Sequence, residues 1–126
     1  MKDRFVNIPA PSGAMETFIT HPERGGPFPV VIIYMDIWGV REELHDIARR
    51  VATVGYYGVV PDLYYRNGRV RHEYRNDKGQ TISSAVLDPQ RLAAVRASRD
   101  TLTDAMVEDD TGALLEFLAR GEPAHP

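Results

Sequence analysis

Two short segments, each directly after an apolar run, are the places where this sequence could carry chemistry. The first, YMDIWG at residues 34–39, follows the run PVVII, and the second, PDLYYRNG at residues 61–68, follows YGVV. A carboxylate such as Asp36 can accept a proton or several hydrogen bonds, and an arginine such as Arg66 can hold a carboxylate in a bidentate pair. Asp36 could equally cap its own turn, as Asp residues often do after strands.

The elements around these segments predict that they lie close together. Pro29–Met35 is a continuous apolar, β-branched run, typical of a strand buried on both faces of a sheet. Arg41–Val54 places apolar residues on one helical face, Gly55 ends that helix, and Tyr57–Val60 predicts a second buried strand. A strand–helix–strand crossover of this length implies two parallel strands in an α/β sheet, and such sheets bind ligands at the carboxyl ends of their strands.

The rest of the chain adds two strands and two helices. Arg4–Ile8 and Ala14–His21 predict strands joined by the turn PAPSG, while Asp88-Pro89 and Thr103 have the residue types that begin helices. Gly121 would end the last helix, and its predicted apolar stripe consists of Val107, Thr111, Leu114, Leu115 and Leu118. Residues 64–87 are polar and irregular, and a loop of that length is either functional or mobile.

Composition excludes several classes of function. The chain has 126 residues, a formal charge of −3 and no cysteine, so we expect one domain over residues 1–126, no nucleic acid or anionic membrane as partner, and no disulfide. It has neither an apolar run of about 18 residues nor a secretory signal, which makes the cytoplasm the default location. No His/Asp/Glu spacing matches a metal site, and Gly25-Gly26 precedes a strand, where a dinucleotide loop must follow one, so we expect no metal and no cofactor.

The segment VVIIYMDIWGVREELHDIARRVATVGYYGVVPDLYYR closely resembles proteins of the dienelactone hydrolase family. The resemblance continues less specifically through DTGALLEFLARG and covers roughly residues 28–121. It implies a partial α/β-hydrolase fold, with a mostly parallel sheet, flanking helices and strand Tyr57–Val60 between Ala14–His21 and Pro29–Met35. It also implies hydrolysis of a small ester or lactone through a nucleophile–His–Asp triad.

Residues of both segments match positions of the family's site. Asp36 matches the acidic residue beside the nucleophile, often a longer Glu in the family, and the backbone N–H of Ile37 would be one half of the oxyanion hole. Trp38 would line the acyl pocket, Tyr64 and Tyr65 would form another wall, and Arg66 could contact a substrate carboxylate.

The sequence departs from the family at the catalytic residues themselves. No Gly-x-Ser/Cys-x-Gly elbow is present, and neither the serines nor the histidines have the context of a nucleophile or a triad base: Ser12, Ser83, Ser84, Ser98, His21, His45, His72 and His125. Whether the nucleophile is Cys or Ser stays open. The resemblance therefore implies that residues 1–126 are the N-terminal part of a single α/β-hydrolase domain. We expect this chain alone to be inactive, and we favour a fragment of a longer enzyme over a natural truncation. The alternative is a non-catalytic α/β module that binds a small molecule or partner; a flavodoxin-like domain would need a phosphate loop, which the sequence lacks.

Several polar residues have plainer interpretations. His45, beside Asp46 on the predicted helix, is expected to be solvated surface, and Asp62 is expected to organise its own turn. The arginines between 66 and 75 are expected to belong to a solvated loop.

The resemblance also predicts an open sheet edge. The strand that would pair with the far side of Pro29–Met35 is absent, so Val30–Tyr34 would be an unpaired edge with apolar residues on both faces. Because unpaired edges template association with another chain, we expect either self-association there or a complementary segment, such as the missing C-terminal half, that covers the edge.

Overall fold

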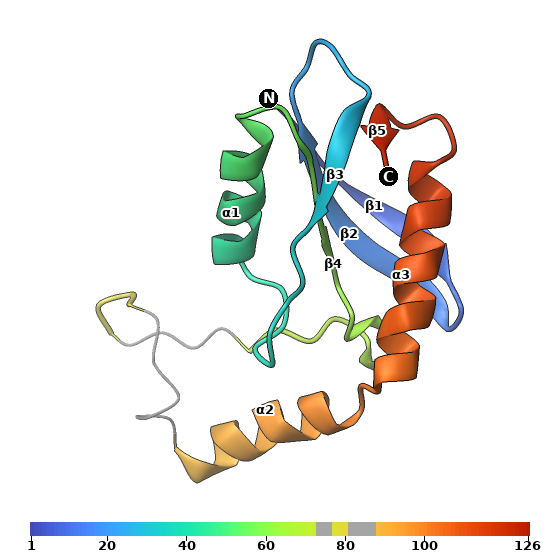
Figure 1. The fold of residues 1–126 in the computed structure, drawn as a ribbon. Coiled ribbons are helices and arrows are strands. Elements are labelled where there is room, and N and C mark those ends of the chain that lie inside the picture. The colour runs from blue at the N-terminus through green and yellow to red at the C-terminus, as the bar shows by residue number, and fades with distance from the viewer. Residues whose placement is uncertain (73–76, 81–87) are drawn as a thin grey trace.

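The protein is a five-stranded sheet with a helix on each face, seen in a computed structural model that describes residues 1–72, 77–80 and 88–126 (Figure 1). The strands are β1 (Lys2–Ala10), β2 (Gly13–His21), β3 (Phe28–Ile32), β4 (Tyr57–Pro61) and β5 (Ala124–His125). The described helices are α1 (Glu42–Ala52), α2 (Pro89–Asp100) and α3 (Asp104–Leu118), and Tyr65–Asn67 forms a 3-10 turn. No helix among the described residues is long and apolar enough to cross a membrane.

The strand order is β1-β2-β4-β3-β5, which confirms that β4 lies between β2 and β3. The β3–β4 and β3–β5 pairs are parallel, while β1–β2 and β2–β4 are antiparallel. The α/β fold class is confirmed, but the described part of the sheet is evenly mixed where a mostly parallel sheet was expected. The cause is the β1–β2 hairpin, which adds its two strands in antiparallel fashion to the edge of β4.

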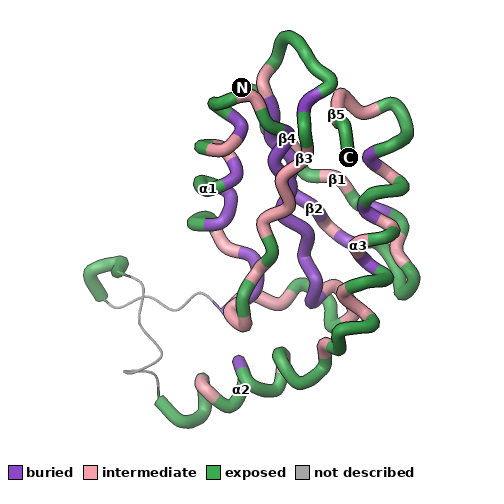
Figure 2. The backbone as a smooth tube through the Cα atoms, viewed as in Figure 1, coloured by how far each residue is buried: buried purple, intermediate pink, exposed green. Residues whose placement is uncertain are grey.

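The sheet separates two apolar cores, as the burial along the chain in Figure 2 shows. On the α3 side, Ile8, Ile19 and Val59 pack with Leu114 and Leu118. The opposite face packs against α1 through a second cluster: Phe18, Val40, Leu44, Ala48 and Val60. Neighbouring residues of one strand, such as Val59 and Val60, enter different cores because successive side chains of a strand point to opposite faces.

Helix α1 approaches the sheet closely at a glycine of β4. A Cβ atom at Gly58 would lie 3.0 Å from the carbonyl oxygen of Ala48 and 3.2 Å from its Cβ. This contact holds the crossover helix against the centre of the sheet. It thereby fixes the loop that leads from β3 into the helix.

Both C-terminal helices begin at the predicted residues. The carboxylate of Asp88 accepts a hydrogen bond from the backbone N–H of Arg91, and the hydroxyl of Thr103 accepts one from that of Met106. The predicted apolar stripe of α3 is partly wrong, since Leu115 is 38% exposed while Asp110 is completely buried. The carboxylate of Asp110 can be buried in α3 because an arginine and a tyrosine hydroxyl bind it, as described below.

The start of β5 is held against the sheet by polar contacts. The N–H of Phe28 donates to the carbonyl of Pro123 at 2.9 Å, and Phe28 and Pro29 pair with Ala124 and His125. Glu122 accepts hydrogen bonds from the hydroxyl of Tyr57, at 2.6 Å, and from the guanidinium of Arg4.

The predicted open edge is therefore covered at its first residues only. Strand β3 ends at Ile32 instead of Met35, although the N–H of Ile33 still donates to Val59 at 2.8 Å. Val30 to Ile33 are partly buried and Tyr34 is exposed, with its hydroxyl 2.8 Å from that of Thr111. Beyond Pro29, no described strand pairs with the outer side of β3.

Candidate functional site

The loop after β3 is a tight turn that fixes one peptide group. The N–H of Gly39 donates to the carbonyl of Asp36 at 3.1 Å, and the N–H of Trp38 donates to the Asp36 carboxylate at 3.0 Å. Gly39 has a φ of +81°, a backbone conformation that favours glycine. The Asp36 carbonyl and the Ile37 N–H belong to the same planar trans peptide, so the N–H points away from the turn. It has no hydrogen-bond partner among the described residues.

The carboxylate of Asp36 is bound by an arginine at the entrance of α1. Arg41 donates from Nη1 and Nη2 to the two oxygens of Asp36, at 2.8 and 3.0 Å. This bidentate pair, together with the bond from Trp38, holds Asp36 as the organiser of its turn. The structure therefore shows Asp36 as a residue that caps its own turn. Asp36 also lines the cleft described next.

The loop after β4 carries the second part of the site. Asp62 organises this loop as expected, because its carboxylate accepts the N–H of Tyr64 at 3.0 Å. The hydroxyl of Tyr64 then donates to the carbonyl of Ile37 at 2.8 Å and joins the two loops. Burial, and next the Asp36 carboxylate, raise the pKa of the Tyr64 hydroxyl, which therefore stays protonated and able to donate at neutral pH.

A cleft of about 230 Å³ opens where these loops meet the junction of α2 and α3. Met35, Asp36, Ile37 and Tyr64 line it from the sheet side. The helical side consists of five residues: Arg99, Leu102, Thr103, Asp104 and Val107. An unpartnered N–H at the carboxyl end of a parallel strand, beside apolar walls, is an arrangement that can bind a carbonyl oxygen or an oxyanion.

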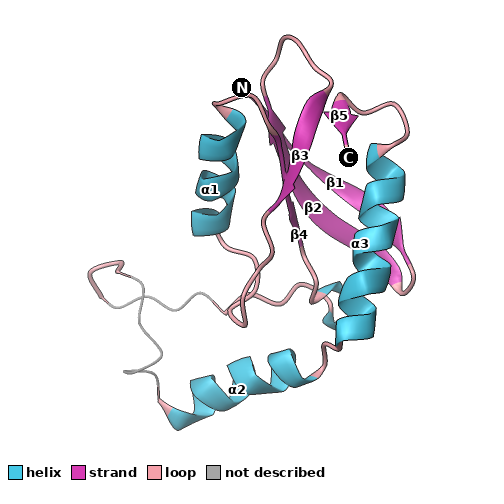
Figure 3. Ribbon diagram, in the orientation of Figure 1, coloured by secondary structure: helices cyan, strands magenta, loops and turns pink. Residues whose placement is uncertain are grey.

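The structure brings three of the six predicted site residues to this cleft, namely Asp36, Ile37 and Tyr64. Trp38 lies outside the cleft lining and is partly buried, and its carbonyl accepts the N–H of His72 at 3.3 Å. Tyr65 and Arg66 also lie outside the cleft lining. The 3-10 turn, which lies beside α3 in Figure 3, directs Tyr65 and Arg66 toward that helix. The substrate-binding roles expected for Trp38, Tyr65 and Arg66 stay predictions.

Tyr65 and Arg66 bind the buried carboxylate of Asp110. Arg66 donates from Nη1 and Nη2 at 2.8 and 3.0 Å, and the hydroxyl of Tyr65 donates at 2.9 Å. Asp110 is 0% exposed. Its position was not recognised in the sequence, although its spacing of four and eight residues from Leu114 and Leu118 places it on their face of the helix. This cluster fixes α3, and therefore one wall of the cleft, to the loop after β4.

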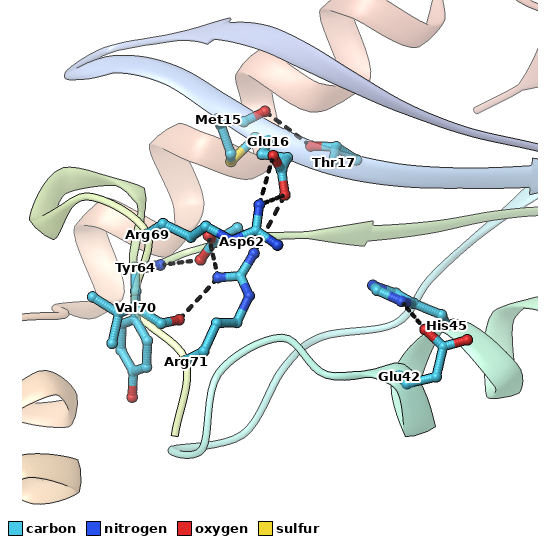
Figure 4. Close-up of polar contacts among 10 residues, drawn as sticks. All are labelled: Met15, Glu16, Thr17, Glu42, His45, Asp62, Tyr64, Arg69, Val70 and Arg71. Atoms are coloured by element: carbon cyan, nitrogen blue, oxygen red, sulfur yellow. Dashed lines mark hydrogen bonds and ion pairs between the residues drawn. The ribbon is translucent and has the colours of Figure 1, made fainter. Parts of the chain in front are cut away.

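A second polar network lies on the other side of the same loop (Figure 4). Arg71 donates to Asp62 at 2.9 Å and to Glu16 at 3.3 Å, and Arg69 donates to Glu16 at 3.2 Å. The expectation of simply solvated arginines is therefore wrong for Arg66 and Arg71, which are ion-paired and partly buried. Arg75, Ser83 and Ser84 lie outside the described residues.

One serine–histidine contact was also not foreseen. Nε2 of His72 lies 2.7 Å from the hydroxyl of Ser98 on α2, and burial lowers the pKa of the His72 ring, which favours its neutral form. Neither residue lines the cleft at Ile37. No sequence signal links them, since 26 residues separate them and part of the intervening segment is irregular. Within the described ranges, no group of three or more His, Asp or Glu side chains could hold a metal ion.

Comparison with known proteins shows which family the chain resembles. The model of the dienelactone hydrolase family matches residues 15–121. A protein of Methylorubrum extorquens named as a carboxymethylenebutenolidase is 40% identical over 112 residues, which are 89% of this chain and 33% of that protein. An Escherichia coli protein of the same name is 42% identical over 65 residues, or 51% of this chain and 24% of that protein.

A solved structure extends the similarity to the fold. The crystal structure of a Klebsiella pneumoniae protein described as a dienelactone hydrolase superposes with a TM-score of 0.74 at 26% identity, covering 98% of this chain and 45% of that one. The chain thus spans about a third of the Methylorubrum relative and less than half of the solved structure. Because the family model matches most of its residues, the chain belongs to the dienelactone hydrolase family.

Proposed function

We propose that this chain contributes the first half of the active site of a hydrolase acting on a small ester or lactone. The observation that carries the proposal is the N–H of Ile37, a residue that lines the cleft: this N–H is fixed by the turn at Asp36 and has no partner among the described residues. A donor held in place before charge develops stabilises the oxyanion of an acyl-transfer transition state most effectively. Tyr64 would support this donor through its bond to the Ile37 carbonyl.

The nucleophile, the triad Asp and the triad His would come from a polypeptide segment other than residues 1–126. Strand β5 supports this assignment because it runs parallel to β3 and begins opposite Phe28. A strand that continued β5 would rise at the same rate as β3 and would end beside the loop at Asp36. A nucleophile elbow follows a strand of this kind, so its side chain would stand next to the cleft.

The roles of Trp38, Tyr65 and Arg66 in substrate binding belong to the same proposal. Trp38 lies directly after Ile37, and a bound acyl group could reach it if the loop opened. Arg66 would first have to leave Asp110, so a carboxylate contact from Arg66 requires a rearrangement at the 3-10 turn.

A chimaera tests the proposal. Residues 1–121 are joined to the part of the Methylorubrum relative that follows its matched segment, and hydrolysis of p-nitrophenyl acetate and of a dienelactone is measured. We expect saturable turnover by the chimaera, none above background by the 126-residue chain, and a lower kcat for Asp36→Ala. A folded chimaera without turnover, whose parent relative is active in the same assay, would contradict the proposal.

The second candidate is a non-catalytic binding module. It is favoured by the pairing of Asp36 with Arg41, which engages both carboxylate oxygens in the turn. In that case the chimaera would fold and remain inactive, and Asp36→Ala would change its stability only.

A further inference from the structure

His45 is buried, contrary to the expectation of a solvated surface residue. Its side chain is 10% exposed and packs against two neighbouring rings of the sheet, with centroids 4.4 Å from Phe18 and 5.5 Å from Phe5. The register of the β1–β2 hairpin places Phe5 opposite Phe18. The two rings together form the surface, on the α1 side of the sheet, against which the His45 ring packs. The ring orientation is therefore fixed by packing.

One nitrogen of the His45 ring has a partner and the other does not. Nδ1 lies 3.0 Å from the carboxylate of Glu42, and because a carboxylate only accepts, Nδ1 carries the proton. Nε2 is buried and has no hydrogen-bond partner. Buried polar atoms without partners are rare in proteins and often mark a place where a water, an ion or a ligand binds.

The ring borders a pocket of about 240 Å³ that is distinct from the cleft at Ile37. Besides His45 and Glu42, the lining has an apolar part, Phe5 and Val40, and three arginines, Arg41, Arg69 and Arg71. In Figure 4 the His45 ring reaches from α1 toward the side of Arg69 and Arg71. The unpartnered nitrogen and these guanidinium groups thus share one pocket.

Two of the arginines retain N–H groups for a ligand. Arg71 uses Nη1 and Nη2 on Asp62, Val70 and Glu16, and its Nε has no partner among the described residues. Arg69 binds Glu16 through Nη1 alone, and its side chain is 69% exposed, so the guanidinium can turn toward the pocket at little cost.

We propose that this pocket binds a small carboxylate ion between Nε2 of His45 and the guanidinium groups of Arg69 and Arg71. With Nδ1 donating to Glu42, a proton on Nε2 would make that nitrogen a second donor, directed to the anion, and the planar fork of an arginine matches a carboxylate. Phe5 and Val40 provide an apolar wall for the organic part of the ligand. The site is independent of the proposed hydrolase activity.

The test is an NMR titration of the 126-residue chain labelled with ¹⁵N in its histidines, with propionate as ligand, propionamide as neutral control and inorganic phosphate as a second anion. We expect the His45 ring nitrogens to shift saturably with propionate and not with propionamide. The proposal fails if propionate causes no saturable shift up to about 100 mM, where even a millimolar site would be filled. It fails equally if phosphate binds and propionate does not.

A matched pair of surface variants locates the site without risk to the fold. Arg69→Gln should weaken propionate binding about tenfold, the loss expected for one charge-assisted hydrogen bond. Arg120→Gln removes a similarly exposed arginine just after the end of α3, 72% exposed, and should leave the affinity unchanged. Equal affinities of the two variants would show that the shift of His45 does not report binding beside Arg69.

Discussion

The hydroxyl of Tyr64 lies 2.8 Å from the carbonyl oxygen of Ile37 and joins the two loops that form the sheet side of the cleft. Tyr64→Phe removes this bond and leaves the Ile37 carbonyl with one donor fewer. We expect a loss of about 1 kcal/mol in the free energy of unfolding and, in the chimaera, a lower kcat with a smaller change in KM. Tyr56→Phe is the matched control, because Tyr56 is exposed and lies outside the cleft lining, so its substitution should change neither kcat nor stability appreciably.

The buried carboxylate of Asp110 should be essential for the position of α3. Asp110→Asn leaves the mostly buried guanidinium of Arg66 without its counter-charge, and breaking a buried pair in this way costs about 3 kcal/mol or more. Urea unfolding measures the difference. Asp109→Asn changes the exposed neighbour and should stay within about 0.5 kcal/mol of the unchanged chain. Similar effects of both variants would show that the Arg66–Asp110 pair does not dock the helix.

Two glycine substitutions should act in opposite directions. At Gly58 a methyl group meets the backbone oxygen of Ala48 at 3.0 Å, so Gly58→Ala should destabilise by about 1–3 kcal/mol as α1 is pushed from the sheet. At Gly112 a methyl group meets open space within α3, and Gly112→Ala should stabilise by about 1 kcal/mol. Thermal unfolding of both variants checks the sign of each effect, and a neutral Gly58→Ala would mean that α1 does not pack as closely as described.

Stability at alkaline pH should depend on Tyr57. Burial raises the pKa of its hydroxyl to about 12, against the lowering effect of Arg4. The folded state therefore holds this proton more tightly than the unfolded state, so the contribution is complete below about pH 10 and is lost as the pH rises to about 12. Between about pH 10 and pH 12, the free energy of unfolding of the unchanged chain should fall by up to about 2 kcal/mol more than that of Tyr57→Phe. Parallel pH profiles of the two proteins would contradict this.

Association should involve the open side of β3. Phe28 directs its N–H to Pro123 and Ile33 directs its N–H to Val59, so by alternation the N–H groups of Val30 and Ile32 face outward beyond β5. We expect oligomers at micromolar concentration in size exclusion with light scattering, and monomers for Val30→Lys, because an edge lysine blocks strand addition. Phe5→Lys, on the opposite edge strand, should leave association intact. A stable monomer of the unchanged chain would refute the role of this edge.

The sequence predicts the elements well where local patterns decide them. The caps at Asp88 and Thr103, the crossover from β3 through α1 to β4, and the turn at Asp62 all follow from short-range chemistry and are present. The resemblance to the family supplied the strand order, which no local pattern contains. Asp110 was not recognised and His45 was wrongly expected to be solvated, because the burial of a charged or titratable side chain depends on distant partners. Those partners, Arg66 and Phe5, come from other parts of the chain.

Contacts between distant parts of the chain also decide which of the expected residues reach the candidate site. Asp36 and Ile37 could be placed because they follow a buried strand, whereas Tyr65 and Arg66 were assigned to the site only through the resemblance to the family. Consecutive residues in a 3-10 turn point in different directions, so only Tyr64 reaches the cleft.

The oxyanion-hole role of Ile37 is tested most directly by removing one hydrogen atom, that of its backbone N–H. Ile37 is the second residue of the turn that begins at Asp36, a position that proline favours, so Ile37→Pro deletes the donor with little change in the turn. In the active chimaera, Ile37→Pro should lower kcat about 100- to 1000-fold, whereas Ile37→Leu, which keeps the N–H, should retain nearly full activity. A folded Ile37→Pro chimaera with unchanged kcat would contradict the assignment of this N–H to the oxyanion hole.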